Sequence, residues 1–537
     1  MTDIRVNAGM NLQSAIDQAM PGDRIIVESG ATFTGPFSLP KKSGDAFVEI
    51  VSSKGADLPP GRITPDKAGM LPKLVSPGAN QSVITTRAAA HHYKLSGLEI
   101  QPASATVIVS DLIRFGDGSS AQNTLESVPH HLVLDRCYIH GFPTMELKRG
   151  VALNSASTDI QNCYISEVHM DGNGDTQAIC GWNGPGPFRI VDSYLEAAGE
   201  NVMFGGADTS IPNLIPSDIE ITRCHFFKPL TWKPTDPSFA GKHWSVKNLL
   251  ETKNARRLKV TGNVFENCWA DAQVGFAILV KSNNQDETNP WAVTEDLEFT
   301  NNIIKNAENG LNILGIENPP KVSATASRLK FVNNLWLVNN IWFQGLRGAK
   351  DVLLDHNTFL TQTGNIMTFD DLPLQGLVAT NNLGKRTGFG IKGSGTSEGV
   401  ATLDAFAPGY NFKRNVIAGA DPRVYPSDNF YPAWTEVQLG ADFRLSPTSP
   451  FKGKGTDGKD VGADIDQILA AQRPAAEAPK PGPTTTPVPG NGTKYSYSSV
   501  AEAQNDSEML KLLNEKGSEG SKYAFAWNGR VYFEKVS

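Results

Sequence analysis

Charged side chains of both signs recur beside short apolar segments in the middle of the chain. Carboxylates and amines held together are the groups that acid–base chemistry and carboxylate recognition require. Glu251 and Lys253 are two residues apart, so in a strand they share one face, and Lys281 follows one repeat later. The candidate catalytic residues are Glu200, Asp208, Glu251, Lys253 and Lys281, and the candidate substrate-binding residues are Arg149, Trp182 and Asp370. A solvated face with incidental ion pairs explains the same residues and stays open as the alternative.

Histidines form a second group with chemical potential, in the first third of the chain. Two adjacent pairs, His91-His92 and His130-His131, each open a predicted strand, and His140 and His169 follow. In neighbouring strands His91 would stack on His130 and His92 on His131. Stacked polar residues at a bend are one interpretation, and a metal site or a general base is the other.

A short acidic loop raises the question of a metal cofactor. The segment Asp171-Gly-Asn-Gly-Asp175 is similar to a calcium loop, but it lacks the downstream glutamate of the helix–loop–helix site. The sequence therefore leaves Ca²⁺ as an alternative there and defines no other cofactor. Several tryptophans offer flat faces on which sugars stack, or else fill the interior: Trp182, Trp232, Trp244, Trp269 and Trp291.

The elements that position these residues belong to a degenerate repeat. The repeat is an alternating apolar segment, then a small or polar residue, one variable residue and a large apolar residue. It recurs at intervals of roughly 23 to 39 residues, as one solenoid coil with loops of differing length would. The small or polar positions are Cys137, Cys163, Ser193, Cys224, Asn263, Asn302, Asn334, Asn357 and Asn382.

The pattern within each copy has a period of two and is rich in Val, Ile, Phe and Tyr, which indicates strands. A coil of this length has no room for a crossover helix. The predicted fold is therefore all-β: a right-handed parallel β-helix with about 4.8 Å between coils. We expect at least ten coils over residues 20–440, with Cys137, Cys163 and Cys224 aligned and facing inward.

The ends of such a solenoid need caps, because open ends expose strand edges and core. A short amphipathic helix within residues 11–20 predicts an N-terminal cap over about 1–30, and a turn-rich segment predicts a C-terminal cap over about 440–470. The β-helix domain is thus expected to span 1–472. A Pro-rich linker at 473–492 and a small α+β module at 493–537 follow.

The small C-terminal module is predicted to have β-α-β-β order. A helix is expected over Ser507–Lys516, and a hairpin is expected to turn at Asn528-Gly529. Forty-five residues make a marginal core, so docking or self-association, for instance as a trimer, stays open.

Composition excludes several classes of protein. The chain has 537 residues and a formal net charge of −7, which argues against nucleic acid as a partner. Five cysteines are too few for a disulfide scaffold. No apolar run is long enough for a membrane helix, so no membrane partner is expected, and the first residues contain no apolar stretch typical of a secretory signal.

The opening Asn11-Leu-Gln-Ser-Ala-Ile-Asp-Gln-Ala-Met-Pro-Gly-Asp23, the Asn-Asn strand repeats and the Ser449-Pro-Phe ending resemble the bacterial pectate-lyase-like right-handed parallel β-helix superfamily. The resemblance covers about residues 3–470 and implies the fold. That superfamily contains lyases, hydrolases, epimerases, phage tailspikes and inert scaffolds, so it transfers no catalytic residue to this chain.

Two functions are consistent with these observations. In the first, the chain binds and cleaves a polysaccharide in a groove along the solenoid, as a lyase or a glycoside hydrolase, and a phage virion spike is one setting for this. In the second, it is a non-catalytic structural or adhesive rod with a C-terminal attachment module. Both place the protein outside the cell or in a virion, with other virion proteins as partners in the latter case.

Overall fold

The structure is a computed structural model that describes residues 2–317 and 322–473, together with strands at 496–497, 501–502, 521–527 and 530–535. The chain divides into two compact units, Met1–Pro474 and Ala475–Ser537. Each unit is described by itself.

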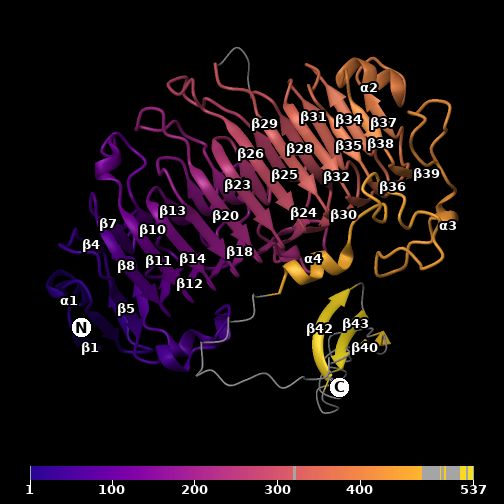
Figure 1. Ribbon diagram of the computed structural model, residues 1–537. Coiled ribbons are helices and arrows are strands. Elements are labelled where there is room, and N and C mark those ends of the chain that lie inside the picture. The colour runs from indigo at the N-terminus through magenta and orange to yellow at the C-terminus, as the bar shows by residue number, and fades with distance from the viewer. Residues whose placement is uncertain are drawn as a thin grey trace, which may run out of the picture. The chain divides into compact units, whose positions relative to one another are not determined.

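The first unit contains three long parallel sheets, here named A, B and C. The chain visits them in turn: β11 (His130–Asp135) lies in sheet A, β12 (Tyr138–His140) in sheet B and β13 (Leu147–Leu153) in sheet C, before β14 (Ala156–Gln161) returns to sheet A. Strands of successive coils lie side by side along the solenoid (Figure 1). The predicted all-β, right-handed parallel β-helix is confirmed.

Among the described residues the sheets have 14, 13 and 12 strands, which agrees with the prediction of at least ten coils. Sheet A consists of β1 (Asp3–Val6), β2 (Arg24–Val27), β5 (Val48–Ser52), β8 (His91–Ser96), β11, β14, β17 (Phe188–Val191), β20 (Ser217–Thr222), β23 (Ala255–Thr261), β26 (Thr294–Thr300), β29 (Ser327–Val332), β32 (Lys350–Asp355), β35 (Val378–Thr380) and β38 (Asn411–Lys413).

Sheet B consists of β3 (Thr32–Thr34), β6 (Lys73–Val75), β9 (Glu99–Gln101), β12, β15 (Tyr164–Ser166), β18 (Tyr194–Glu196), β21 (His225–Phe227), β24 (Val264–Cys268), β27 (Ile303–Ala307), β30 (Leu335–Val338), β33 (Thr358–Leu360), β36 (Leu383–Lys385) and β39 (Val416–Ala418). Sheet C consists of β4 (Phe37–Leu39), β7 (Ile84–Thr86), β10 (Val109–Phe115), β13, β16 (Gln177–Gly181), β19 (Glu200–Phe204), β22 (Leu250–Thr252), β25 (Phe276–Lys281), β28 (Asn309–Leu314), β31 (Phe343–Leu346), β34 (Met367–Asp370) and β37 (Ile391–Gly393).

Each sequence repeat forms two strands, because the small or polar residue lies at the bend between sheets A and B. Cys137 follows β11 and precedes β12, and Cys163 and Cys224 occupy equivalent positions two residues after paired strand ends. All three thiols are buried in the interior, as predicted. The chain therefore has three strands per coil where the sequence pattern distinguished two.

An asparagine ladder continues this bend along the later coils. The Asn263 backbone N–H donates to Asn302 Oδ1 at 2.9 Å, and the Asn302 backbone N–H donates to Asn334 Oδ1 at the same distance. The same contacts continue through Asn357 and Asn382 and extend to Asn415 and Asn429, beyond the predicted members. Buried backbone groups at the bend are satisfied in this way.

The N-terminal end of the first unit is covered by helix α1 (Leu12–Gln18), within the range expected for the cap. The Asn11 side chain caps it by accepting from the Ser14 N–H at 3.0 Å. Leu12, Ala15 and Ile16 enter the core that runs through the solenoid. The remaining helices are α2 (Val400–Phe406), α3 (Trp434–Val437), α4 (Ile465–Ala471) and the 3₁₀ turns η1 (Gly55–Asp57), η2 (Pro65–Met70), η3 (Leu125–Ser127) and η4 (Leu230–Trp232).

The segment expected to close the C-terminal end packs on the last strand of sheet B and then folds back along the solenoid. Ile465 and Ile468 of α4 pack with Leu335 of β30, and the Asp464 N–H donates to Asn333 Oδ1. Asn429 and Phe430 lie against the last coil, where Phe430 pairs with Val416 of β39. Phe451 and Val461 pack with Val416 and Ala418 of β39, so the segment after 440 also contacts the last strand of sheet B before α4 reaches β30.

The second unit contains the strands β40 (Ser496–Tyr497), β41 (Ala501–Glu502), β42 (Ser521–Trp527) and β43 (Arg530–Lys535). β42 pairs with β43 in antiparallel orientation, at the place where a hairpin is predicted. The predicted helix Ser507–Lys516, the turn at 528–529 and residues 474–492 of the predicted linker lie outside the described residues. Within the described residues, no helix has the length and apolar character needed to cross a membrane.

Candidate functional site

A row of polar side chains crosses four strands of sheet C. Arg149 on β13 donates to Asp111 on β10 at 3.2 Å and to Gln177 Oε1 on β16 at 3.0 Å. Gln177 donates onward to Glu200 Oε2 on β19 at 2.8 Å. The register explains this row, because Arg149, Gln177 and Glu200 are paired positions of consecutive coils.

The row meets a group of opposite charges on the following coils. Lys281, at the end of β25, lies 2.9 Å from Glu251 Oε1 on β22 and 2.7 Å from Glu317 Oε1. Lys253 lies 3.7 Å from the same Glu251 oxygen. Arg149, Gln177, Glu200, Glu251, Lys253, Lys281 and Glu317 are together called the sheet C network.

Burial and neighbouring charge separate the two central carboxyl groups. Burial raises the pKa of Glu200, and the charges of Glu251 and Asp175 raise it further, to about 7. Burial also acts to raise the pKa of Glu251, but Lys281 and Lys253 outweigh it and hold that pKa below its usual range. At neutral pH, Glu251 is therefore ionised and Glu200 exchanges its proton.

Lys253 of the network is held in its cationic form. Burial lowers the pKa of Lys253, but Glu251 and Glu200 outweigh this effect and raise the pKa overall. A cation of this kind pairs with a carboxylate and does not act as a base at neutral pH. The network therefore places one fixed positive charge, that of Lys253, close to Glu200, which titrates near neutrality.

The network is buried at its centre and reaches solvent at one side. The Glu251 side chain is 1% exposed and that of Lys253 is 17% exposed. A further ion pair lies near Glu200, between Lys247 and Asp175, and the Asp175 side chain is 54% exposed. Lys253, Lys247 and Asp175 are here called the mouth of the network.

Four of the five predicted catalytic residues thus come together, and Asp208 does not. The Asp208 carboxylate accepts from the Thr288 N–H at 2.9 Å and from its hydroxyl at 2.7 Å, which ties two loops to each other. None of the described contacts of Asp208 involves the network.

Of the three predicted binding residues, two lie at the network. Arg149 belongs to it, and the Arg149 guanidinium lies 5.1 Å from the ring centre of Trp182. Trp182 is half-buried and its indole N–H donates to Gly118 O. Asp370 lies at the exposed end of β34, several coils away along sheet C, and accepts from the Asp371 N–H.

The other predicted tryptophans are interior or anchoring residues. Trp232, Trp244 and Trp269 are buried together with Ala198 and Val246, and Trp291 donates its indole N–H to Leu214 O. The Asp171–Asp175 loop does not group with other metal ligands in the described chain, and Asp175 is paired with Lys247.

Several site residues were missed by the sequence analysis: Gln177, Lys247, Glu317 and the wholly buried Lys228. The Lys228 ammonium donates to three consecutive carbonyls, those of Ala197, Ala198 and Gly199, and to Asn201 Oδ1. Burial lowers its pKa to about 8. Lys228 fixes the turn that leads into β19, and therefore the position of Glu200. Gln177 is the register partner of Glu200 one coil earlier, and this spacing in the sequence could have identified Gln177 as a site residue.

The histidines stack as the sequence predicted. His91 and His130 have ring centres 4.9 Å apart with planes at 4°, and those of His92 and His131 are 4.5 Å apart at 10°. Burial lowers the pKa of His92 and of His130, and the neighbouring histidines lower them further. His140 and His169 lie apart from this stack, paired with Glu99 and Glu167.

Several solved structures are similar to the chain at low sequence identity. A pectate lyase, Pel9A, is 13% identical over 86% of this chain and 96% of its own, with a TM-score of 0.35. A family PL6 alginate lyase, AlyGC, is 14% identical over 90% of this chain and 60% of its own, with a TM-score of 0.41. A tailspike protein of E. coli bacteriophage HK620 is 11% identical over 81% and 77%, with a TM-score of 0.37.

No family model matches the sequence, and no curated protein is significantly similar to it.

Proposed function

We propose that the chain binds an acidic polysaccharide at the mouth of the sheet C network and cleaves it by β-elimination. The observation behind the proposal is the combination of a fixed cation, Lys253, with a carboxyl group, Glu200, whose pKa is about 7. Elimination from a uronate needs a positive charge on the substrate carboxylate and a base for the proton next to it.

Each residue then has a defined role. Lys253 pairs with the substrate carboxylate, and Glu200 accepts the α-proton. The electrons of that C–H bond form a carbon–carbon double bond as the glycosidic oxygen leaves. Glu251 is assigned no contact with substrate, because its charge is paired with Lys281 and Lys253 and holds both in place. Glu200 is only 2% exposed, so contact with the sugar requires the nearby Asp175–Lys247 ion pair to open.

Elimination fits these residues better than hydrolysis does. Glycoside hydrolysis needs two carboxyl groups that both reach the scissile bond, one as acid and one as base or nucleophile. Glu251 is ionised, but the ammonium groups of Lys281 and Lys253 lie 2.9 Å and 3.7 Å from it and neutralise it. It is therefore a poor nucleophile, and one titrating carboxyl group remains.

The test is incubation of the full chain with polygalacturonate, alginate and a glycosaminoglycan, followed by the ultraviolet absorbance of unsaturated product. We expect one of the three to be cleaved, and the Glu200→Gln variant to lose the activity while keeping its fold. Asp370→Asn is the matched control, because Asp370 is a carboxylate of the same sheet outside the network. Cleavage without unsaturated product, or full activity in Glu200→Gln, contradicts the proposal.

A structural or adhesive rod, such as part of a virion fibre, is the second candidate. It is favoured by the closure of the network, in which Glu251 and Lys281 are buried and paired with each other. A rod predicts no binding of any of the three polymers and self-association of the full chain, for instance as a trimer, in sedimentation velocity. Binding at Lys253 by a monomer argues against it.

A further inference from the structure

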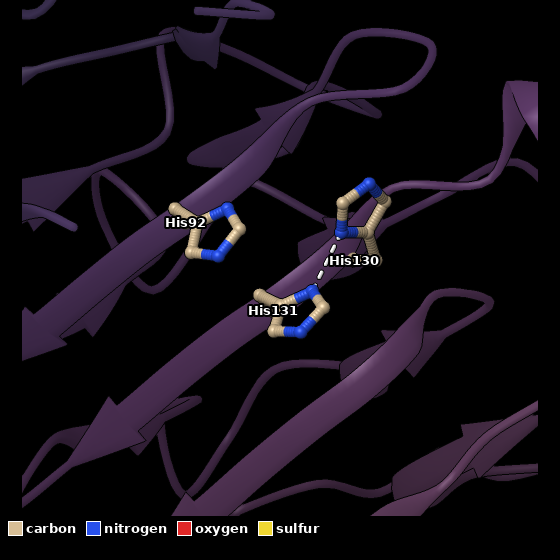
Figure 2. A group of neighbouring side chains, drawn as sticks. All are labelled: His92, His130 and His131. Carbon is tan, nitrogen blue, oxygen red and sulfur yellow. Dashed lines mark hydrogen bonds between the residues drawn. The ribbon is translucent and has the colours of Figure 1, made fainter. Parts of the chain in front are cut away.

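Four histidines gather on sheet A, away from the sheet C network. His91 and His92 open β8, His130 and His131 open β11, and His130 is the register partner of His91. Figure 2 shows the His92 and His131 rings side by side on neighbouring strands, with His130 next to His131.

The backbone explains why consecutive histidines reach the same place. Adjacent residues of a regular strand point to opposite faces. His92 and His131 have φ values of +57° and +53°, in the left-handed region, which interrupts that alternation. The Nδ1 atoms consequently lie 2.8 Å apart in the His91–His92 pair and 2.7 Å apart in the His130–His131 pair.

The ring nitrogens are close enough to share one ion. One ligand atom each from His92, His130 and His131 lie within 4.8 Å of one another, and so do those of Asp45, His91 and His92. Ligands of a tetrahedral zinc ion, at about 2.0–2.1 Å from the metal, are separated by roughly 3.4 Å. Small side-chain rotations bring the imidazoles to that spacing.

The same position on later coils shows what is missing at the histidines. Register places His131 in one row with Ser157 and Pro187 of the next two coils, and then with Asp218, Arg257, Asp296 and Arg328 of the four coils after them. The last four residues form ion pairs between coils, with Arg257 at 2.6 Å from Asp218 and Arg328 at 2.5 Å from Asp296. The two histidine coils instead place imidazoles beside imidazoles, with their ring nitrogens facing one another. A cation between these nitrogens would supply the missing opposite charge.

We propose that His92, His130 and His131 bind a divalent transition metal ion of the Zn²⁺ class, with the Asp45 carboxylate or a water molecule as fourth ligand. Imidazole nitrogen is a preferred ligand of Zn²⁺, Cu²⁺ and Ni²⁺. A surface depression of about 350 Å³, lined by Phe47, His131, Asp159 and Arg189 among others, adjoins the site. A small molecule that reaches an open metal position would enter there.

The proposal is tested by calorimetric titration of the chelator-treated full chain with Zn²⁺, and by the visible spectrum of the Co²⁺-loaded protein. We expect one ion per chain and the absorption of tetrahedral Co²⁺ with nitrogen ligands. In the double variant His92→Asn, His131→Asn both signals are lost. Asparagine suits this test because it tolerates the left-handed backbone that both positions require.

The matched control is His243→Asn, which removes an exposed histidine that is paired with Asp271 outside the cluster. This variant should bind Zn²⁺ as the parent protein does. Circular dichroism shows whether each variant is folded, and the single variant His131→Asn, at an exposed position, replaces the double variant if that does not fold. Absence of Zn²⁺ binding in the parent, or unchanged binding in a folded His131 variant, overturns the proposal.

Discussion

Removal of one side-chain amide from the asparagine ladder should strongly destabilise the bend between sheets A and B, although only a few atoms are lost. The Asn302 side chain accepts from the Asn263 backbone N–H at 2.9 Å and from Asn263 Nδ2 at 3.0 Å. It donates to Val260 O at 3.0 Å and to Asn334 Oδ1 at 3.1 Å. Asn302→Ala removes all four contacts from a site that is wholly buried.

The magnitude follows from the backbone groups left without partners. The Asn263 N–H and the Val260 carbonyl each lose a hydrogen bond, at about 1–3 kcal/mol for each buried group. The expected loss is about 4 kcal/mol in the free energy of opening this coil. Because about 1.4 kcal/mol corresponds to a factor of ten, hydrogen exchange at the Asn263 amide should accelerate by roughly three orders of magnitude.

The assay is hydrogen exchange by mass spectrometry on a peptide that contains Asn263, supported by urea unfolding. The matched control is Cys163→Ser at an equivalent bend position. Ser193 already occupies such a position, where it accepts from the Cys163 N–H and donates to Val191 O. That control should change stability by less than about 1 kcal/mol. Unchanged exchange at Asn263 in Asn302→Ala, or equal damage in Cys163→Ser, would refute the reasoning.

Three further predictions concern the buried charges. The pKa of Glu200 rises from its ordinary 4.5 to about 7 on folding, so the contribution of Glu200 to stability is complete below about pH 4.5 and is lost as pH rises through 7. Relative to the parent protein, Glu200→Gln should therefore raise the melting temperature more at pH 8 than at pH 5. An equal difference at the two pH values would contradict this. Lys281→Met leaves Glu251 buried without its closest cation and should cost about 3–5 kcal/mol in urea unfolding, most of which the second change Glu251→Gln should restore; a double variant no better than the single one would be inconsistent with the pair. Lys228→Met leaves four buried acceptors without a donor and should cost more than about 3 kcal/mol, whereas Lys330→Met, at an exposed position, should cost less than about 1 kcal/mol; similar losses in both would show that the Lys228 contacts contribute little.

The repeat pattern was sufficient to predict the solenoid because side-chain types report local burial. Cys137, Cys163 and Cys224 occur at equivalent points of an alternating pattern, and they are aligned and buried in the structure. The third strand of each coil was not recognised, because strands such as β12 and β15 have only three residues and follow the bend directly. A three-residue strand has too few alternations for its period to be measured.

The candidate site was predicted in part for the same reason. Glu251, Lys253 and Lys281 are close in register, so sequence spacing alone brings them together. Asp208 and Glu317 belong to loops, whose course depends on contacts far along the chain, such as that between Asp208 and Thr288. Loop positions have no period, and the sequence therefore misplaced the first and missed the second.

The central claim is that an acidic polysaccharide binds at Lys253, and equilibrium binding tests it most directly. The measurement is calorimetric titration of a uronate oligosaccharide into the Glu200→Gln protein, which binds without cleaving. The account predicts saturable binding that is lost when Lys253→Met is added and is retained when Asp370→Asn is added instead. Equal affinity in the Lys253→Met and Asp370→Asn proteins would contradict it.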